Sequence, residues 1–66
     1  EPFLIGTVET RGGNRTMVNF GPRGKIQEEL RLREGTQVSL LVRPGRINGR
    51  QALIAEQIHA GDSTVN

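Results

Sequence analysis

The side chains best suited to chemistry in this chain are its cations, and all but one of them are arginines. Eight Arg and one Lys stand against seven acids, which gives the 66 residues a formal net charge of +2. A guanidinium group can hold a phosphate through two parallel hydrogen bonds, whereas a lysine ammonium binds it as a point charge. This composition favours a phosphate-bearing partner.

The arginines are concentrated in predicted turns, where they could flank a groove. Residues 35–55 contain three arginines and no acid. A positive groove follows the phosphate backbone of a single-stranded nucleic acid, and aromatic rings stack on its bases. Loop arginines that serve only solubility are the alternative interpretation. The candidate nucleic-acid-binding residues are Arg11, Arg15, Phe20, Arg23, Lys25, Arg43, Arg46 and Arg50.

Aromatic side chains are scarce, and this limits the kind of binding that the sequence predicts. Phe3 and Phe20 are the only two, and there is no Trp or Tyr. Phe20 ends a predicted strand close to the expected groove, although a phenylalanine in an alternating strand is also typical of a core. Binding would therefore depend mainly on phosphates, vary strongly with salt and discriminate little between sequences.

Enzymatic and metal-dependent functions are not indicated. His59 is followed by Asp62 and Ser63, but this group lies in a polar segment with nothing to fix its geometry. Glu28 and Glu29 are adjacent, so on a strand they would point to opposite faces. With one His and no Cys the chain offers no typical metal ligand set, and we expect no cofactor.

Length and hydropathy restrict the setting in which the chain works. A chain of this size buries only about 60% of the surface that it exposes when unfolded, so we expect one small domain with a marginal core. No apolar run reaches the roughly 18 residues of a transmembrane span, so no membrane partner is expected. The absence of Cys is compatible with a cytoplasmic location.

Turn signals divide the chain into five segments, and each alternates more like a strand than like a helix. Asn48-Gly49 is a strong hairpin signal, and Pro44-Gly45 is expected to interrupt the strand before it. Segment 25–33 fits a helix nearly as well as a strand, and we expect a strand with one helical turn near residues 30–33. The five segments are about 3–10, 15–20, 25–33, 37–43 and 51–58.

Five short strands with glycine-rich turns predict an all-β fold, namely a small five-stranded OB-like barrel over residues 1–58, with an SH3-like barrel as the alternative. Residues 59–66 are expected to be a flexible polar tail. On an OB barrel, oligonucleotides lie across strands two and three, between the loops that join strands 1–2 and 4–5. Those two loops hold Arg11, Arg15, Arg43, Arg46 and Arg50.

One stretch of the chain is similar to RNA-binding OB domains. Residues 32–40 read Leu-Arg-Glu-Gly-Thr-Gln-Val-Ser-Leu, and Gly49-Arg50-Gln51-Ala52 follows. Together they resemble the second half of cold-shock and S1-type domains, which share a Leu-x-x-Gly-x-x-Val pattern leading into strand four. This resemblance implies RNA binding on an OB barrel. The aromatic motifs expected of a cold-shock domain are absent between Arg15 and Leu32.

A second resemblance covers most of the chain. Pro2, Leu4-Ile5-Gly6-Thr7-Val8, Gly21-Pro22 and the same Leu-x-x-Gly-x-x-Val segment are similar to the OB domain of proteasome-associated AAA ATPases. That resemblance implies a hexameric ring through which substrate is threaded. The hairpin at residues 44–50 is longer than in that family.

Two functions therefore follow from the sequence. The first is a non-catalytic module that binds single-stranded RNA or DNA. The alternative is a structural or oligomerisation module, in a homo-oligomer or in a larger assembly such as a hexameric ATPase ring. Leu41 and Leu53 are expected to face outward, where they could cover a neighbouring subunit. A pocket for a small anion ranks third, because only the arginines support it.

Overall fold

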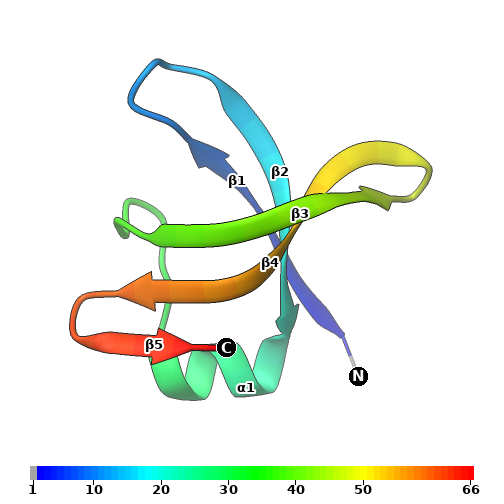
Figure 1. Ribbon diagram of the computed structural model, residues 1–66. Coiled ribbons are helices and arrows are strands. Elements are labelled where there is room, and N and C mark those ends of the chain that lie inside the picture. Colours follow the sequence, from blue (N-terminus) through cyan, green and yellow to red (C-terminus); the bar gives the residue numbers. More distant parts are fainter. Residues whose placement is uncertain (1) are drawn as a thin grey trace.

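Two long hairpins and one short helix make up the protein (Figure 1). The computed structural model describes residues 2–66. Five strands form one sheet in the order β1-β2-β4-β3, and the short β5 pairs with β4, which confirms the predicted mostly-β, five-stranded fold. The elements are β1 (Phe3–Glu9), β2 (Arg15–Pro22), α1 (Arg23–Leu30), β3 (Ser39–Ile47), β4 (Arg50–Ala60) and β5 (Ser63–Val65).

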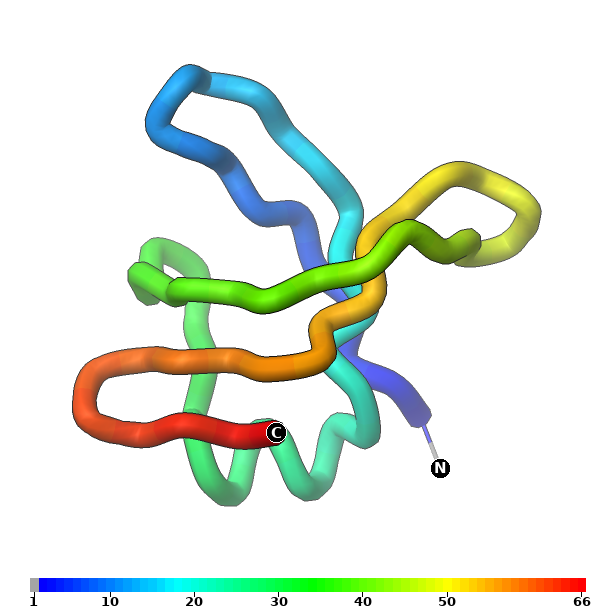
Figure 2. Tube along the Cα trace, viewed as in Figure 1, coloured from blue at the N-terminus to red at the C-terminus, as the bar shows by residue number. Residues whose placement is uncertain are grey.

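The two hairpins meet at a single short junction. Strands β2 and β4 run parallel and pair only through Val18 with Leu53 and Asn19 with Ile54. From this junction the β1–β2 and β3–β4 hairpins diverge (Figures 1 and 2). Within residues 2–66 the end strands β1 and β3 do not pair with each other, so the sheet is open and the predicted barrel is not confirmed.

The core lies between the sheet and α1. Val18 and Phe20 stand two residues apart on β2 and therefore share one face of the strand. They pack with Ile26 of α1, Ile58 of β4 and Val65 of β5 in one buried cluster. Residues from every element of the fold thus meet in a core that is small, as the chain length predicts.

Leu41 and Leu53 do not lie on the same side of the sheet. Leu41 is 59% exposed, as expected. Leu53 packs against the core instead, because it pairs with the buried Val18 across the β2–β4 junction. The prediction that Leu53 faces outward is therefore wrong, and the residue that takes the opposite face of β4 is Ile54.

Segment 25–33 does not form the strand that we expected. The helix α1 covers Arg23–Leu30, and the helical turn expected near residues 30–33 lies several residues too late. Good helix formers fill this stretch, and the four-residue spacing of Ile26 and Leu30 directs both toward the core. The helix follows Pro22 and ends at Arg31, whose left-handed φ of 49° stops it.

The β3–β4 hairpin turns at Asn48-Gly49, as predicted. Ile47 pairs with Arg50, and both turn residues have positive φ, 51° for Asn48 and 80° for Gly49. Strand β3 continues through Pro44 and Gly45 rather than stopping before them. Proline is tolerated there because β3 is an end strand, so one side of its backbone needs no partner.

Residues 59–66, expected as a flexible polar tail, take part in the sheet. Strand β4 extends to Ala60, and Ser63–Val65 returns along it as β5. Val65 is buried in the core, and the Nδ1 atom of His59 lies 2.7 Å from Oγ1 of Thr64. A tight turn and one apolar residue near the end are enough to dock an otherwise polar segment. In residues 2–66 no helix is long and apolar enough to cross a membrane.

Candidate nucleic-acid interface

An open cleft of about 630 Å³ lies where the two hairpins diverge. Strands β2 and β4 separate on the N-terminal side of Val18 and Leu53, so the start of β2 faces the start of β4 across a gap. The β3 strand adds its middle residues to the far wall. The cleft is lined by Arg15, Thr16, Met17, Pro44, Gly45, Arg46, Gln51, Ala52 and Leu53.

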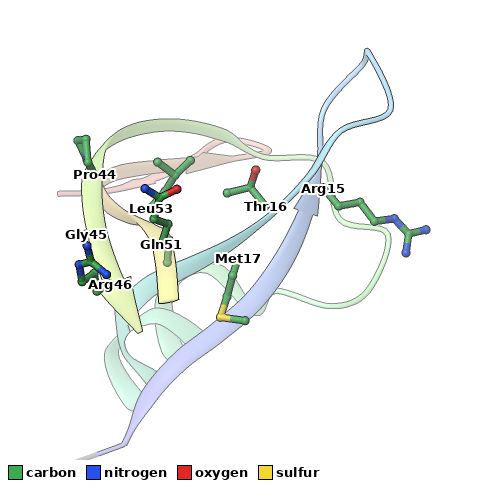
Figure 3. A pocket seen from close by; sticks show the side chains of 9 residues that line it. Arg15, Thr16, Met17, Pro44, Gly45, Arg46, Gln51 and Leu53 are labelled. Carbon is green, nitrogen blue, oxygen red and sulfur yellow. The ribbon is translucent and has the colours of Figure 1, made fainter. Parts of the chain in front are cut away.

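The side chains of the cleft are arranged with charge at its ends and polar groups between them. Figure 3 shows Thr16 directed across the gap toward Leu53 and Gln51. Arg15 stands at the β2 end with its guanidinium group pointing outward, and Arg46 stands on the β3 side. A ligand that lies across the cleft would therefore meet Arg46 on the β3 side and hydrogen-bonding groups in the middle, while the Arg15 guanidinium group stands at the rim and points away from them.

The electrostatics of the cleft are uniformly positive. None of its lining residues is acidic. Within residues 2–66, neither Arg15 nor Arg46 forms an ion pair with a carboxylate. Nη1 of Arg46 donates a hydrogen bond to the carbonyl oxygen of Gly49 at 3.0 Å, which uses one of its five N–H groups and holds the side chain along the hairpin.

Arg11 and Arg50 lie at the two hairpin turns and do not line the cleft, and Arg11 lines the separate groove beside β1. Arg11 is exposed in the β1–β2 turn, where the Thr10 N–H donates to the Asn14 carbonyl oxygen at 2.9 Å. Arg50 is exposed at the first position of β4, directly after the tight turn. The structure thus places Arg11, Arg15, Arg46 and Arg50 in or beside the two hairpin turns, and of these only Arg15 and Arg46 line the cleft.

Three of the predicted cations lie elsewhere or are already engaged. Arg23 and Lys25 are exposed on α1, at the other end of the molecule from the hairpin tips (Figure 1). Arg43 pairs with Glu56, with Nε 3.6 Å from Oε2. The predicted set therefore divides into four free arginines on the hairpins, one paired arginine and two distant cations.

Phe20 belongs to the core and not to the surface. Its side chain is only 9% exposed and packs in the cluster with Val18 and Ile26. A ring in this position has no free face on which a base could stack, so the stacking role is corrected to a packing role. Phe3, which is 55% exposed, is the one phenylalanine of the described chain that reaches solvent.

Thr16, Met17 and Gln51 line the cleft although no pattern in the sequence indicated them. They come together only because β2 and β4, more than 30 residues apart in sequence, run parallel at one short junction. Parallel pairing between distant strands has no local turn signal, unlike a hairpin. The hairpin tips could be found from sequence, but the floor of the cleft could not.

No group of three or more His, Cys, Asp or Glu side chains in residues 2–66 is placed to hold a metal ion. Comparison of the chain with protein-family models, with curated proteins and with solved structures gives no match. The resemblances to cold-shock, S1-type and ATPase-associated OB domains therefore stay predictions. Any conclusion on function depends on the geometry of the cleft itself.

Proposed function

We propose that the protein is a non-catalytic module that binds single-stranded nucleic acid through its phosphates in the cleft between the hairpins. The strongest support is that Arg15 and Arg46 lie on opposite sides of a cleft that has no acidic lining residue. Within residues 2–66, neither arginine forms an ion pair with a carboxylate. Guanidinium groups bind phosphate oxygens in a bidentate manner, so arginines on the two sides of the cleft could each hold a phosphate of the same strand.

The composition of the cleft favours a flexible strand and weak sequence selectivity. The hydroxyl of Thr16 and the amide of Gln51 can donate to or accept from sugar and base groups of many kinds. The apolar lining residues beside them are aliphatic or Met17, and no aromatic ring lines the cleft. Affinity would then come from phosphates, with a strong dependence on salt and little preference among bases.

The expected position of the ligand is the one that an OB barrel gives an oligonucleotide, between two loops. The two arginine-bearing hairpins correspond to the loops that flank an oligonucleotide on an OB barrel, and closure of the sheet is not required for them to do so. Both RNA and DNA are proposed ligands, since nothing in the cleft selects a 2′-hydroxyl group. A cytoplasmic location, where such ligands are present, is part of the same proposal.

The test is fluorescence anisotropy with a labelled 12-mer, as single-stranded RNA and as DNA, over a range of salt. Four phosphate contacts from Arg11, Arg15, Arg46 and Arg50 predict a log–log slope of about −3, at about −0.7 per contact. The double variant R15Q/R46Q removes two contacts and should reduce the slope to about −1.4. It should also weaken binding to all sequences alike.

The matched control is R23Q/K25Q, which removes the same amount of charge from the distant α1. It should keep the slope of the parent chain, because neither residue lies near the cleft. Equal losses in the two double variants would mean that net charge and not the cleft attracts the strand. No binding by the parent chain at low salt would reject the proposed function.

A further inference from the structure

The two end strands of the sheet differ in how they are protected from pairing with another chain. Strand β3 carries Arg43, Pro44 and Arg46, and charge and proline are the usual means of protecting an exposed edge. Strand β1 has neither Lys, Arg nor Pro between Phe3 and Glu9, and its one charged side chain, Glu9, stands at the end of the strand. Its Phe3 and Ile5 are 55% and 44% exposed, and in residues 2–66 it pairs with β2 alone.

The hydrogen bonds at the turn show which backbone groups of β1 face away from β2. The Thr10 N–H donates to the Asn14 carbonyl oxygen, so Thr10 faces β2. In an antiparallel pair, alternate residues face the partner strand, which assigns Val8 and Gly6 to β2 as well. Beyond the bulge, the Pro2 carbonyl oxygen accepts a hydrogen bond from the Arg23 N–H, so Pro2 faces the β2 side. Even-numbered residues of β1 therefore face β2 on both sides of the bulge. The outward-facing residues are therefore Phe3, Ile5, Thr7 and Glu9.

We propose that β1 is a self-association edge, on which the β1 strand of a second copy pairs antiparallel about a two-fold axis at Gly6. In this register Ile5 lies opposite Thr7 of the second copy, and Phe3 lies opposite Glu9 of the second copy. All the outward-facing residues of β1 then form hydrogen-bonded pairs. Two-fold registers centred on Ile5 or on Thr7 would leave one of them outside the pairing.

Side chains support the same register. Leu4 meets Val8 of the second copy on the core side of the sheet, so apolar groups lie opposite each other. Glu9 meets Phe3 and not another Glu9, so no like charges face each other. The two copies of Gly6 form the central pair, which is a narrow one with Cα atoms about 4.5 Å apart, and glycine removes any crowding there.

The outer edge of β1 has room for another strand. A groove of about 1140 Å³ separates it from the connection between α1 and β3. Leu4, Val8, Leu32 and Val38 form much of the apolar lining, and each is only half-buried in the single chain. Leu4 and Val8 of the second copy would point into this groove and cover that lining. A second copy therefore buries apolar surface in addition to adding strand hydrogen bonds.

The first test is analytical ultracentrifugation of the parent chain, of I5K and of L41K over a wide concentration range. Ile5 and Leu41 are both exposed aliphatic residues on end strands of the sheet. L41K is therefore the matched control for the charge that I5K adds. We expect a concentration-dependent dimer for the parent and for L41K. I5K should raise the dissociation constant by about tenfold or more, because a charge on a flat edge opposes strand pairing. Both variants change solvent-exposed side chains, so both should fold.

The second test determines the register of the β1–β1 pairing by disulfide cross-linking. The chain contains no cysteine, so only the introduced cysteines can form a disulfide. Chains with I5C and chains with T7C are mixed and oxidised with diamide. Hydrogen-bonded antiparallel pairs have Cα atoms about 5.5 Å apart, which suits a disulfide. The mixture should give more cross-linked dimer than either variant alone.

Three results would overturn the proposal. A parent chain that stays monomeric at the highest concentration leaves the β1 edge to a strand of another protein. Equal weakening by I5K and L41K would move the contact away from β1. Efficient cross-linking of either cysteine variant alone would exclude the register centred on Gly6. The cleft lies on the other side of β2 and shares only Arg15 with this groove, so anisotropy with the 12-mer tests the cleft separately from these self-association results.

Discussion

The β1–β2 and β3–β4 hairpins each place one strand at an end of the sheet, yet they differ in turn, pairing and charge. The β3–β4 hairpin closes with the two-residue Asn48-Gly49 turn and carries three arginines in and beside it. The β1–β2 hairpin closes through a longer glycine-rich turn, and its bulge follows Leu4, whereas the bulge of the β3–β4 hairpin follows Leu41. Its outer surface shows Phe3, Ile5 and Met17.

This difference separates two kinds of surface on one small sheet. Arginines and a proline make the β3 edge unsuitable for strand pairing and suitable for an anionic ligand. The apolar β1 edge has the opposite character. A core this small cannot bury all the apolar side chains of the two hairpins, and three of the four large ones left exposed lie on the β1–β2 hairpin, with Leu41 on β3.

The largest difference is expected for two isoleucines, one in each hairpin. Ile58 is 2% exposed and Ile5 is 44% exposed. I58A should lower the free energy of unfolding by about 2–5 kcal/mol, because it leaves a cavity in the core. I5A should lower it by about 0.5 kcal/mol or less, as is usual on a surface. Urea denaturation at a protein concentration low enough to keep the chain monomeric measures both.

If I58A is unfolded without urea, I58V replaces it, with an expected loss of about 0.5–1.5 kcal/mol. Similar losses for I5A and I58V would contradict the assignment of β1 as an exposed edge. They would show instead that Ile5 is buried in solution.

A smaller difference is expected for the glycines in the two end strands. A Cβ atom on Gly45 of β3 would overlap the Ile54 side chain, at both Cγ1 and Cδ1. A Cβ atom on Gly6 of β1 would lie 3.5 Å from Cε2 of Phe20, an ordinary contact. G45A should therefore destabilise the fold by about 1–3 kcal/mol through overpacking. G6A should be neutral or stabilising by up to about 1 kcal/mol, since alanine loses less backbone entropy.

The same urea denaturation measures these two variants. If G45A is as stable as the parent chain, Ile54 can change rotamer without cost. The side chains between β3 and β4 would then be less closely packed in solution than in the structure. Because Gly45 also lines the cleft, a destabilising G45A would tie the shape of the cleft to the packing of the β3–β4 hairpin.

Local signals in the sequence predicted the hairpins well. The Asn48-Gly49 turn, the strand at residues 3–10 and the arginines near both turns follow from neighbouring residues, and the structure has all of them. Segment 25–33 was harder, because Ile26 and Leu30 suit a helix while Ile26, Glu28 and Leu32 suit a strand. The outcome depended on docking against Val18 and Val65, which no local pattern shows.

The candidate site was predictable only in its charged parts. Arg15 and Arg46 are visible as charges beside turns, but their position on one cleft depends on the parallel contact of Val18 with Leu53. Phe20 is an aromatic residue at a position in the sequence that suits base stacking. Only its burial in the structure shows that it packs in the core instead. The open edge of β1 could not be predicted either, because a closed barrel would have covered it.

The smallest effect concerns the one arginine of the β3–β4 hairpin that has an ion-pair partner. Arg43 and Glu56 are 58% and 50% exposed, and exposed pairs contribute about 0–1 kcal/mol, so E56Q should barely change the free energy of unfolding. It does release Arg43 toward any bound phosphate. The salt slope for a 12-mer should then become steeper by at most about 0.7, one further contact. E29Q, which removes an acid from α1, is the control and should leave the slope unchanged. If both variants steepen the slope equally, overall charge governs binding, and the contrast between the two hairpins would then have no functional meaning for nucleic acid.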